Sequence, residues 1–130
     1  MSTANDVQEI YIGLLGRAAD KPGLDYWVAE IDAGILTIED VRANIVNEQP
    51  EYLNGIGMMT RSQGVTQLYN NLFGRAPEPE GLDYWVNGDG ASVNFDQLVV
   101  ALINGASPTD RLTLDNLSLI HISEPTRLGM

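Results

Sequence analysis

The sequence predicts an all-α fold, a compact multi-helix domain built from two pseudo-equivalent helical repeats. Residues 14–28 return at residues 72–86, shifted by 58 positions (72 − 14 = 58). Such self-similarity at a fixed period is typical of units that cannot bury their apolar face alone. Apolar residues recur at helical spacing in both copies, and no useful length of chain alternates with a strand's period of two. We therefore expect one domain over residues 1–116, with repeat one at about 3–57 and repeat two at about 58–116.

The two copies share a set of identical residues at equivalent positions. These residues are Gly16, Arg17, Gly23, Leu24, Asp25, Tyr26, Trp27 and Val28, with their counterparts Gly74, Arg75, Gly81, Leu82, Asp83, Tyr84, Trp85 and Val86.

The first repeat begins with two amphipathic helices. Asn5 or Asp6 is the expected N-cap of the first, because a short side-chain oxygen can accept from the orphan amides of the first turn. Gly16 follows its last apolar residue and suits a left-handed helix exit. Pro22 suits the first turn of the second helix, which ends at Gly34. The expected buried residues of this pair are Val7, Ile10, Tyr11, Leu14, Leu15, Leu24, Trp27, Val28 and Ile31.

Two further helices complete the first repeat. Thr37 followed by Asp40 resembles a shortened capping box and starts the third helix. Pro50 then opens a short helix that stops at Gly55 and Gly57. The residues expected to face inward are Ile38, Val41, Ile45 and Val46.

The second repeat follows the same order. Thr60 or Ser62 starts its first helix, and the second helix stops early at residues 87–90, where two glycines occur. Asn94 is the expected N-cap of the next helix, and residues 107–108 (Ser-Pro) open a last one. The residues expected inside the last two helices are Phe95, Leu98, Val99, Leu102, Ile103, Leu112 and, secondarily, Leu114.

Composition limits the classes of partner. The chain has 130 residues, which is a single-domain length, and its apolar share of 44% fits a globular protein. A formal net charge of −11 argues against nucleic acid and anionic membrane surfaces, and leaves cations, cationic partners and neutral glycans open. No apolar run approaches a membrane span, so we expect no membrane insertion. The absence of cysteine excludes disulfides, and the first residues lack the pattern of a cleaved signal.

The repeated polar residues favour a structural role. Asp25 lies in the first turn of its helix and Arg17 just before it, so we expect an ion pair that braces the loop, and likewise for Arg75 and Asp83. The less favoured alternative is a polar ligand site. A pair of carboxylates for glycoside hydrolysis is disfavoured, because arginine lowers a carboxyl pKa and a general acid needs a raised one.

Of the repeated aromatic residues, we expect the tryptophan to pack in the core and the tyrosine to be the better placed for contact with a ligand. Trp27 lies on the apolar stripe, so we expect it in the core with its indole N–H donating to a carbonyl. Tyr26 is one position round the helix and is the better candidate for contact with a sugar. We expect Gly23 and Gly81 to permit close helix approach.

A calcium site and a catalytic site are both disfavoured. Residues 87–96 offer oxygen ligands but lack the order of an EF-hand, so a helix stop and restart is the simpler interpretation. Without residues 117–130 the chain has no His, no Cys and the single lysine Lys21, which excludes histidine-assisted nucleophiles. We therefore expect no cofactor and no enzyme activity.

The segment 117–130 is interpreted as an artefact. Its residues 117–127 match the translation of a transposase sequencing adapter, and we expect the biological sequence to end near Asn116. This segment contains His121, the only histidine. We expect it to be unpacked or falsely helical.

The two motif copies closely resemble the bacterial domain of unknown function 4214, over about residues 7–116. That family's pattern is a tyrosine with leucines, Gly-Arg, a turn and Gly-Leu-x-Tyr-Trp; Tyr11 and Tyr69 supply the tyrosine, while Ala19 replaces the usual proline of the turn. The resemblance implies a helical fold similar to the phycobilisome linker domain. It also implies a place in large secreted or surface proteins, such as S-layer-like proteins and adhesins, exported by type I systems. It implies only structural roles for the motif residues.

These observations together predict a non-catalytic attachment module at the N-terminus of a longer secreted or cell-surface protein. Its expected partners are a surface glycan such as lipopolysaccharide, or like modules. The alternatives are an intracellular protein-binding scaffold of the linker kind, and a helical accessory region of a carbohydrate-active enzyme.

Overall fold

The computed structural model describes residues 3–117, and within that range the chain is helical with no strand. The first repeat contains α1 (Thr3–Leu15), α2 (Lys21–Asp32), α3 (Ile38–Glu48), α4 (Pro50–Leu53) and the 3-10 turn η1 (Ile56–Met58). The second contains α5 (Arg61–Phe73), α6 (Pro79–Val86), the 3-10 turn η2 (Asp89–Ser92), α7 (Phe95–Asn104) and a helix over residues 108–117. The all-α prediction is confirmed.

The helix positions repeat with the period of the sequence. The helix α5 begins and ends 58 positions after α1 (61 − 3 and 73 − 15), and α6 begins 58 positions after α2 (79 − 21). The helix that starts at residue 108 likewise corresponds to α4, which starts at Pro50. The two halves therefore consist of the same supersecondary unit.

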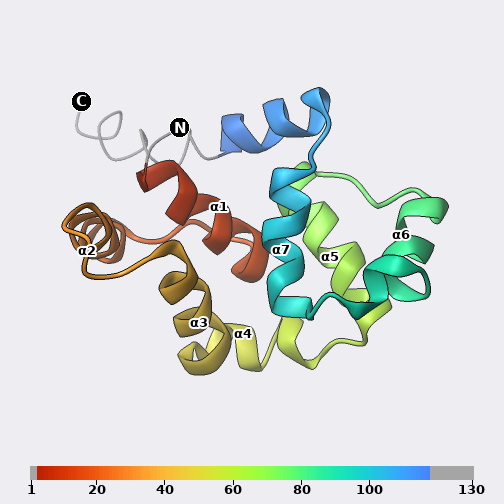
Figure 1. Ribbon diagram of the computed structural model, residues 1–130, viewed down its shortest axis with the longest axis horizontal. Helices are drawn as coiled ribbons and strands as arrows, with labels where there is room; N and C mark the ends of the chain where they lie inside the picture. Colours follow the sequence, from red (N-terminus) through yellow and green to blue (C-terminus); the bar gives the residue numbers. More distant parts are fainter. Residues whose placement is uncertain (1–2, 118–130) are drawn as a thin grey trace.

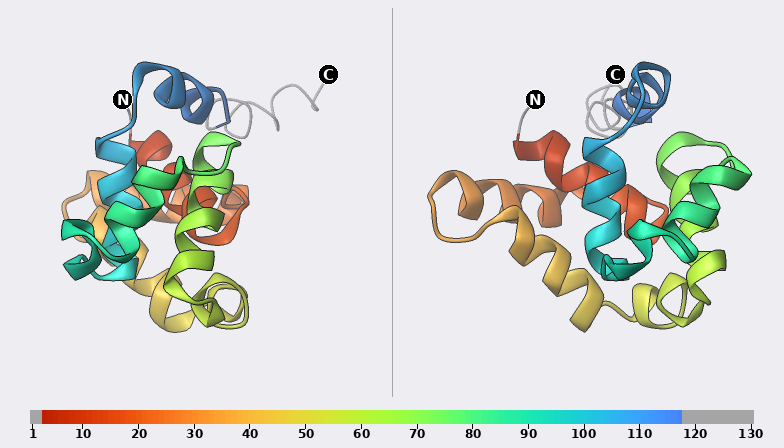
Figure 2. Two further views of the ribbon diagram at one scale, coloured as in Figure 1. Left: turned by 90° about the vertical axis from the view of Figure 1, so that its right-hand side faces the viewer. Right: turned by 45° about the vertical axis from the view of Figure 1, so that its right-hand side comes forward.

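The two units meet around α1 and α5. Figure 1 shows α1 and α5 in the middle of the molecule, with α2 and α6 at opposite ends, and the right-hand view of Figure 2 shows the same separation. The Nδ2 group of Asn71 donates to the carbonyl of Gly13 at 3.0 Å, and these positions are 58 apart. Gln97 Nε2 donates to Glu39 Oε1 at 3.4 Å, again 58 positions apart. A residue that contacts its own equivalent lies near a symmetry axis, so a pseudo-twofold axis runs between the repeats.

One core is formed by helices of both units, and it contains most of the residues predicted to face inward. Helix α1 packs against α2, α3, α5 and α7. The fully buried side chains include Val7, Leu14, Val41, Ile45, Val65, Leu68, Leu72, Leu98, Val99 and Leu114. The order of the last two leucines is the reverse of the prediction, because Leu112 is exposed and Leu114 is fully buried. The face of the helix 108–117 that meets the core is thus shifted from the predicted one.

Two glycines let helices approach closely. A Cβ at Gly13 would lie 2.4 Å from Val99 Cγ2, and one at Gly64 would lie 2.7 Å from Phe95 Cζ. Both glycines therefore mark places where α7 packs directly on the backbone of α1 or α5.

The helix ends follow the expected chemistry with two exceptions. Thr37 and Thr60 each form a capping box, and Gly16, Gly34 and Gly74 leave their helices with positive φ. The predicted first N-cap is wrong, because α1 begins at Thr3 and already includes Asn5 and Asp6. Asn94 occupies its N-cap position without a side-chain cap hydrogen bond.

The predicted boundary at residue 116 falls inside a helix. The helix from residue 108 continues through residue 117, and residues 118–130, which hold most of the interpreted adapter and His121, lie outside the described residues. The adapter hypothesis stays a prediction.

Candidate functional site

Each repeated arginine braces its loop, but with a different carboxylate from the one predicted. Arg17 binds Glu51 through Nε (2.7 Å) and Nη2, and Arg75 binds Asp110 through Nε (2.9 Å) and Nη2 (2.7 Å). Both carboxylates lie in the first turn of the helix that closes their unit, where the helix dipole favours a negative charge. The arginine therefore ties the loop after α1 or α5 to the last helix of the same unit.

The predicted partners of these arginines have other contacts. Asp25 accepts from Lys21 Nζ at 3.0 Å, one turn away on α2, and Asp83 accepts from Asn87 Nδ2 at 3.1 Å. The predicted pairing of Arg17 with Asp25 and of Arg75 with Asp83 is therefore wrong. Both aspartates are exposed, and neither lies in the first turn of its helix, so the predicted first-turn position of Asp25 is also wrong.

The two ion pairs differ in burial. The Asp110 side chain is 10% exposed, whereas that of Glu51 is 49% exposed. Hydrogen bonds from the arginine lower the pKa of both carboxyl groups, Glu51 through Arg17 and Asp110 through Arg75. The second pair is better shielded from solvent, so we expect its loss to lower the free energy of unfolding more than loss of the first.

The arginines also lie over the repeated tyrosines. The Arg17 guanidinium is 5.9 Å from the ring centre of Tyr11, and that of Arg75 is 5.4 Å from the ring centre of Tyr69. These distances are within the range of a cation–π interaction. Tyrosine, arginine and carboxylate thus form the same stack in both units.

The first unit closes this stack with its tryptophan. Trp27 is 8% exposed, which confirms its predicted place in the core. Its indole Nε1–H donates to the Tyr11 hydroxyl at 3.1 Å, so the expected carbonyl acceptor is wrong. Tyr26 is 55% exposed and lies edge-on to Trp27, which confirms its predicted place near the surface.

The second unit leaves the same place open. Trp85 is only partly buried, and within residues 3–117 its indole N–H makes no hydrogen bond. A pocket of about 250 Å³ lies here, and its lining includes Tyr69, Phe73, Arg75, Trp85, Ser107 and Asp110. Aromatic faces and a polar ion pair therefore meet in one hollow of the second unit.

A shorter helix and one arginine account for this difference. Helix α6 has 8 residues where α2 has 12, as the two glycines of residues 87–90 predicted. Arg61 donates from Nε to the Trp85 carbonyl (2.7 Å) and from Nη2 to the Gly90 carbonyl (2.9 Å). These bonds hold the end of α6 and η2 against the start of α5.

The predictions for the motif glycines and leucines are only partly confirmed. Gly23 donates its amide to Asp20 Oδ1 in the N-cap of α2, so its predicted role in close helix approach is wrong. Gly81 lies beside the Tyr69 hydroxyl, which a Cβ would meet at 3.6 Å, an ordinary contact. Leu24 is buried, and Leu82 is partly buried and packs against the core.

Sequence reasoning missed the buried polar residues. Gln8 is buried and accepts the Ala19 amide at 2.8 Å, and buried Glu9 pairs with Arg111. Burial raises the pKa of the Glu9 carboxyl, and the Arg111 guanidinium offsets part of that rise. Glu9 is off the apolar face of α1, and it is buried because the helix 108–117 covers it, which no local pattern indicates.

The described part of the chain contains no ready metal centre. No group of three or more His, Cys, Asp or Glu residues within residues 3–117 is placed to hold a metal ion. The predicted helix stop and restart at residues 87–96 is present as η2 and the start of α7. None of the helices described there is long and apolar enough to cross a membrane.

Comparison with known proteins yields one family. The family described as "Domain of unknown function (DUF4214)" matches residues 1–54 and again residues 43–92. No curated protein and no solved structure matches the chain. The two matches agree with the two copies of the motif and of the helical unit.

Proposed function

The chain belongs to the family described as Domain of unknown function (DUF4214), and we propose that it is a non-catalytic interaction module of a longer secreted or cell-surface protein. In this proposal the module attaches the protein to a surface glycan. Type I-like export to the cell surface is part of the same proposal, and the absence of cysteine from the chain is compatible with it.

The observation that carries the glycan proposal is the open pocket of the second unit. Sugar rings present apolar faces for stacking and hydroxyl groups for hydrogen bonds. Trp85 and Tyr69 provide aromatic surface, and the Arg75–Asp110 pair provides donors and acceptors beside it. A site of this composition suits a sugar ring.

The charge of the chain favours a glycan that is neutral or carries positive groups. The formal net charge of −11 repels polyanions over the range of the Debye length. The polar groups of the pocket are themselves an ion pair with little net charge.

A glycan array probed with the full chain and two matched variants tests this proposal. Trp85→Leu removes the aromatic wall of the pocket, whereas Trp27→Phe changes the equivalent position of the closed unit. We expect the wild-type chain and Trp27→Phe to bind the same glycans, and Trp85→Leu to lose at least about tenfold in affinity.

Two outcomes contradict the proposal. One is the absence of binding to any surface polysaccharide, and the other is equal binding by Trp85→Leu and the wild type. If the chain binds no glycan but binds a second helical module, a protein-binding scaffold of the linker kind is the better description.

A further inference from the structure

One face of α5 is uncharged. Residues 52–74 contain a single charged residue, Arg61, in a chain that has 18 acidic and 7 basic residues. Neutral polar side chains recur on α5 at the i, i+3, i+4, i+7 spacing of one helix face. The two outer residues of this stripe are exposed, and the two middle ones are partly buried. These four residues, which form the amide face of α5, are Gln63, Thr66, Gln67 and Asn70.

The chain covers the equivalent face of α1. The positions 58 residues earlier (63 − 5 = 58) are Asn5, Gln8, Glu9 and Ile12. The last three are buried, and Arg111 of the helix 108–117 pairs with Glu9. The counterpart of that helix in the first unit is α4, which has only 4 residues. Within the described residues, the fold therefore covers this face with a helix on α1 and leaves it open on α5.

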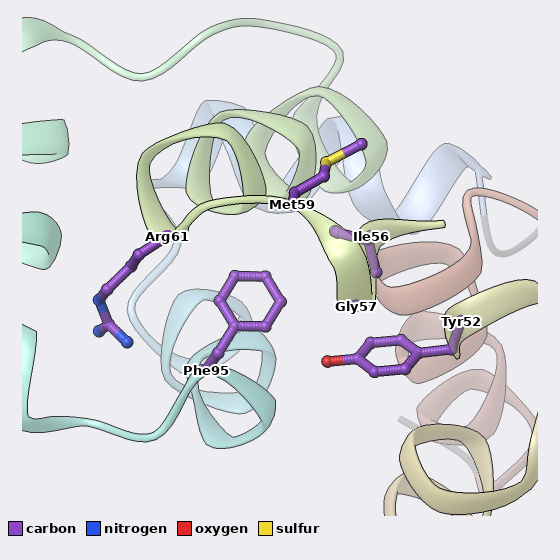
Figure 3. Close-up of a pocket in the computed structure, with 6 residues that line it drawn as sticks. All are labelled: Tyr52, Ile56, Gly57, Met59, Arg61 and Phe95. Carbon is purple, nitrogen blue, oxygen red and sulfur yellow. The ribbon is translucent and has the colours of Figure 1, made fainter. Parts of the chain in front are cut away.

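A shallow hollow lies along the open face. Its volume is about 410 Å³, and its lining residues are Met59, Ser62, Gln63, Thr66 and Gln67. Met59 is 39% exposed, and Figure 3 shows its side chain directed away from the rings of Tyr52 and Phe95. The amide face thus has a flexible apolar side chain at one end, a residue type that adapts well to a partner surface.

The amide face has hydrogen-bonding groups that residues 3–117 leave unused. Gln63 Oε1 accepts the N-cap amide at 3.1 Å, whereas its Nε2 donates to nothing in that range. Asn70 Nδ2 donates to the Thr66 carbonyl at 2.9 Å, whereas its Oδ1 accepts nothing there. Gln67 Nε2 donates one N–H to the next amide side chain on α5, and its second N–H is left over. The face therefore offers both free donors and free acceptors.

Two properties of the face favour a second copy of this chain as its partner. A net charge of −11 makes two copies repel each other, and the repulsion is smallest where uncharged faces meet. Amide and hydroxyl groups both donate and accept hydrogen bonds, so a patch made of them can pair with itself across a twofold axis.

We propose that the amide face of α5 binds the same face of a second copy, as an antiparallel pair of helices whose twofold axis passes between Thr66 and Gln67. Gln63 and Asn70 lie equally far from this axis, so the free Nε2 group of one meets the free Oδ1 atom of the other across the pair. In the same register, the second N–H of Gln67 meets the hydroxyl oxygen of Thr66.

The size of the face makes this a weak contact. A helix of 13 residues is about 20 Å long, so one helix face buries less than a standard interface. We expect a Kd on the order of 0.1–1 mM. The amide face shares no residue with the open pocket of the second unit, so this proposal is independent of the glycan proposal.

Concentration-dependent measurements on the full chain test the contact. Sedimentation equilibrium between about 0.02 and 2 mM measures the dimer, and ¹⁵N NMR of the side-chain amides locates it. We expect the amide signals of Gln63 and Gln67 to shift with protein concentration, and that of Asn47, which is exposed on α3, to stay unchanged. A chain that is still monomeric at about 2 mM overturns the proposal, as does a dimer that leaves the Gln63 and Gln67 signals unmoved.

A matched pair of charge variants tests the face. Gln67→Glu brings two carboxylates together across the twofold axis, so it is expected to weaken the dimer by at least about tenfold. Asn47→Glu adds the same charge on α3 and is expected to change the affinity by less than about twofold. Equal weakening by the two variants overturns the amide face as the site of contact.

A double variant tests the antiparallel register. Gln63→Glu keeps the capping box of α5, because glutamate accepts the N-cap amide as glutamine does. Combined with Asn70→Lys it leaves the net charge at −11 and places opposite charges across the axis in both halves of the dimer. The double variant is expected to bind at least about threefold more tightly than the wild type. Affinity equal to or below that of the wild type overturns the proposed register.

Discussion

The hydrogen bond between Trp27 and Tyr11 gives the sharpest test of how the two units differ. Trp27→Phe removes the indole N–H and leaves the buried Tyr11 hydroxyl without its 3.1 Å partner. Tyr11→Phe does the reverse, and it keeps the ring that lies under Arg17. In the double variant neither polar group is left behind.

The magnitudes follow from the burial of both groups. An orphaned buried donor or acceptor costs about 1–3 kcal/mol, and the smaller ring at position 27 adds about 1 kcal/mol of lost packing. Each single variant should therefore lose about 1–4 kcal/mol of unfolding free energy. The double variant should lose less than the sum by about 1–3 kcal/mol, which is the coupling energy of the pair.

The second unit supplies the control cycle. Tyr69 and Trp85 occupy the equivalent positions, and within the described residues no hydrogen bond joins them. Their coupling energy should be below about 0.5 kcal/mol. Urea unfolding followed by circular dichroism at one temperature measures both cycles. Equal coupling energies in the two units would refute the reasoning.

Three further predictions concern the ion pairs and the helix packing. Arg75→Gln should lower the free energy of unfolding by about 1–3 kcal/mol, and Arg17→Gln by less than about 1 kcal/mol, because Asp110 is more buried than Glu51. Urea unfolding of the two variants measures both losses, and equal losses would contradict this prediction. The hydrogen bonds from Arg75 lower the pKa of Asp110, so its contribution is present above an unfolded pKa of roughly 4 and is lost as pH falls through the folded value. Urea unfolding against pH should therefore show a shallower acid limb for Asp110→Asn, and an unchanged limb would exclude this linkage. Gly13→Ala should lower the free energy of unfolding by about 1–3 kcal/mol, because the new Cβ would lie 2.4 Å from Val99 Cγ2. Adding Val99→Ala removes that methyl group, so the double variant should recover part of the loss.

The architecture was accessible from the sequence because it depends on local signals that occur twice. Apolar spacing, helix-capping residues and exit glycines such as Gly16 and Gly74 act within one or two turns. A fixed shift of 58 positions then related the two halves. The early end of α6 was predicted in the same way, from two glycines close together.

The partners of the repeated arginines were not accessible in that way. Glu51 is 34 positions from Arg17, and Asp110 is 35 positions from Arg75, so the two carboxylates are not in register with the repeat. A comparison of equivalent positions finds neither pair. Only the packing of the closing helix against the loop brings each pair together.

The open pocket depends on a residue outside the repeated motif. Arg61 holds the carbonyl of Trp85, and the equivalent position in the first unit is Thr3, which instead donates to Asp32. The two tryptophans are identical in the motif, but their surroundings differ. Identity at equivalent positions therefore predicted a common fold but not a common environment.

The central claim is that both units share one packing and that only the second leaves the indole N–H of its tryptophan without a hydrogen bond within the described residues. The exchange rates of the two indole N–H protons test this claim most directly. The chain contains two tryptophans, so an ¹⁵N spectrum resolves two indole signals that Trp27→Phe assigns. We expect the Trp27 proton, buried and bonded to Tyr11, to exchange with water much more slowly than the Trp85 proton. Equal protection of the two protons, or faster exchange at Trp27, would contradict the account.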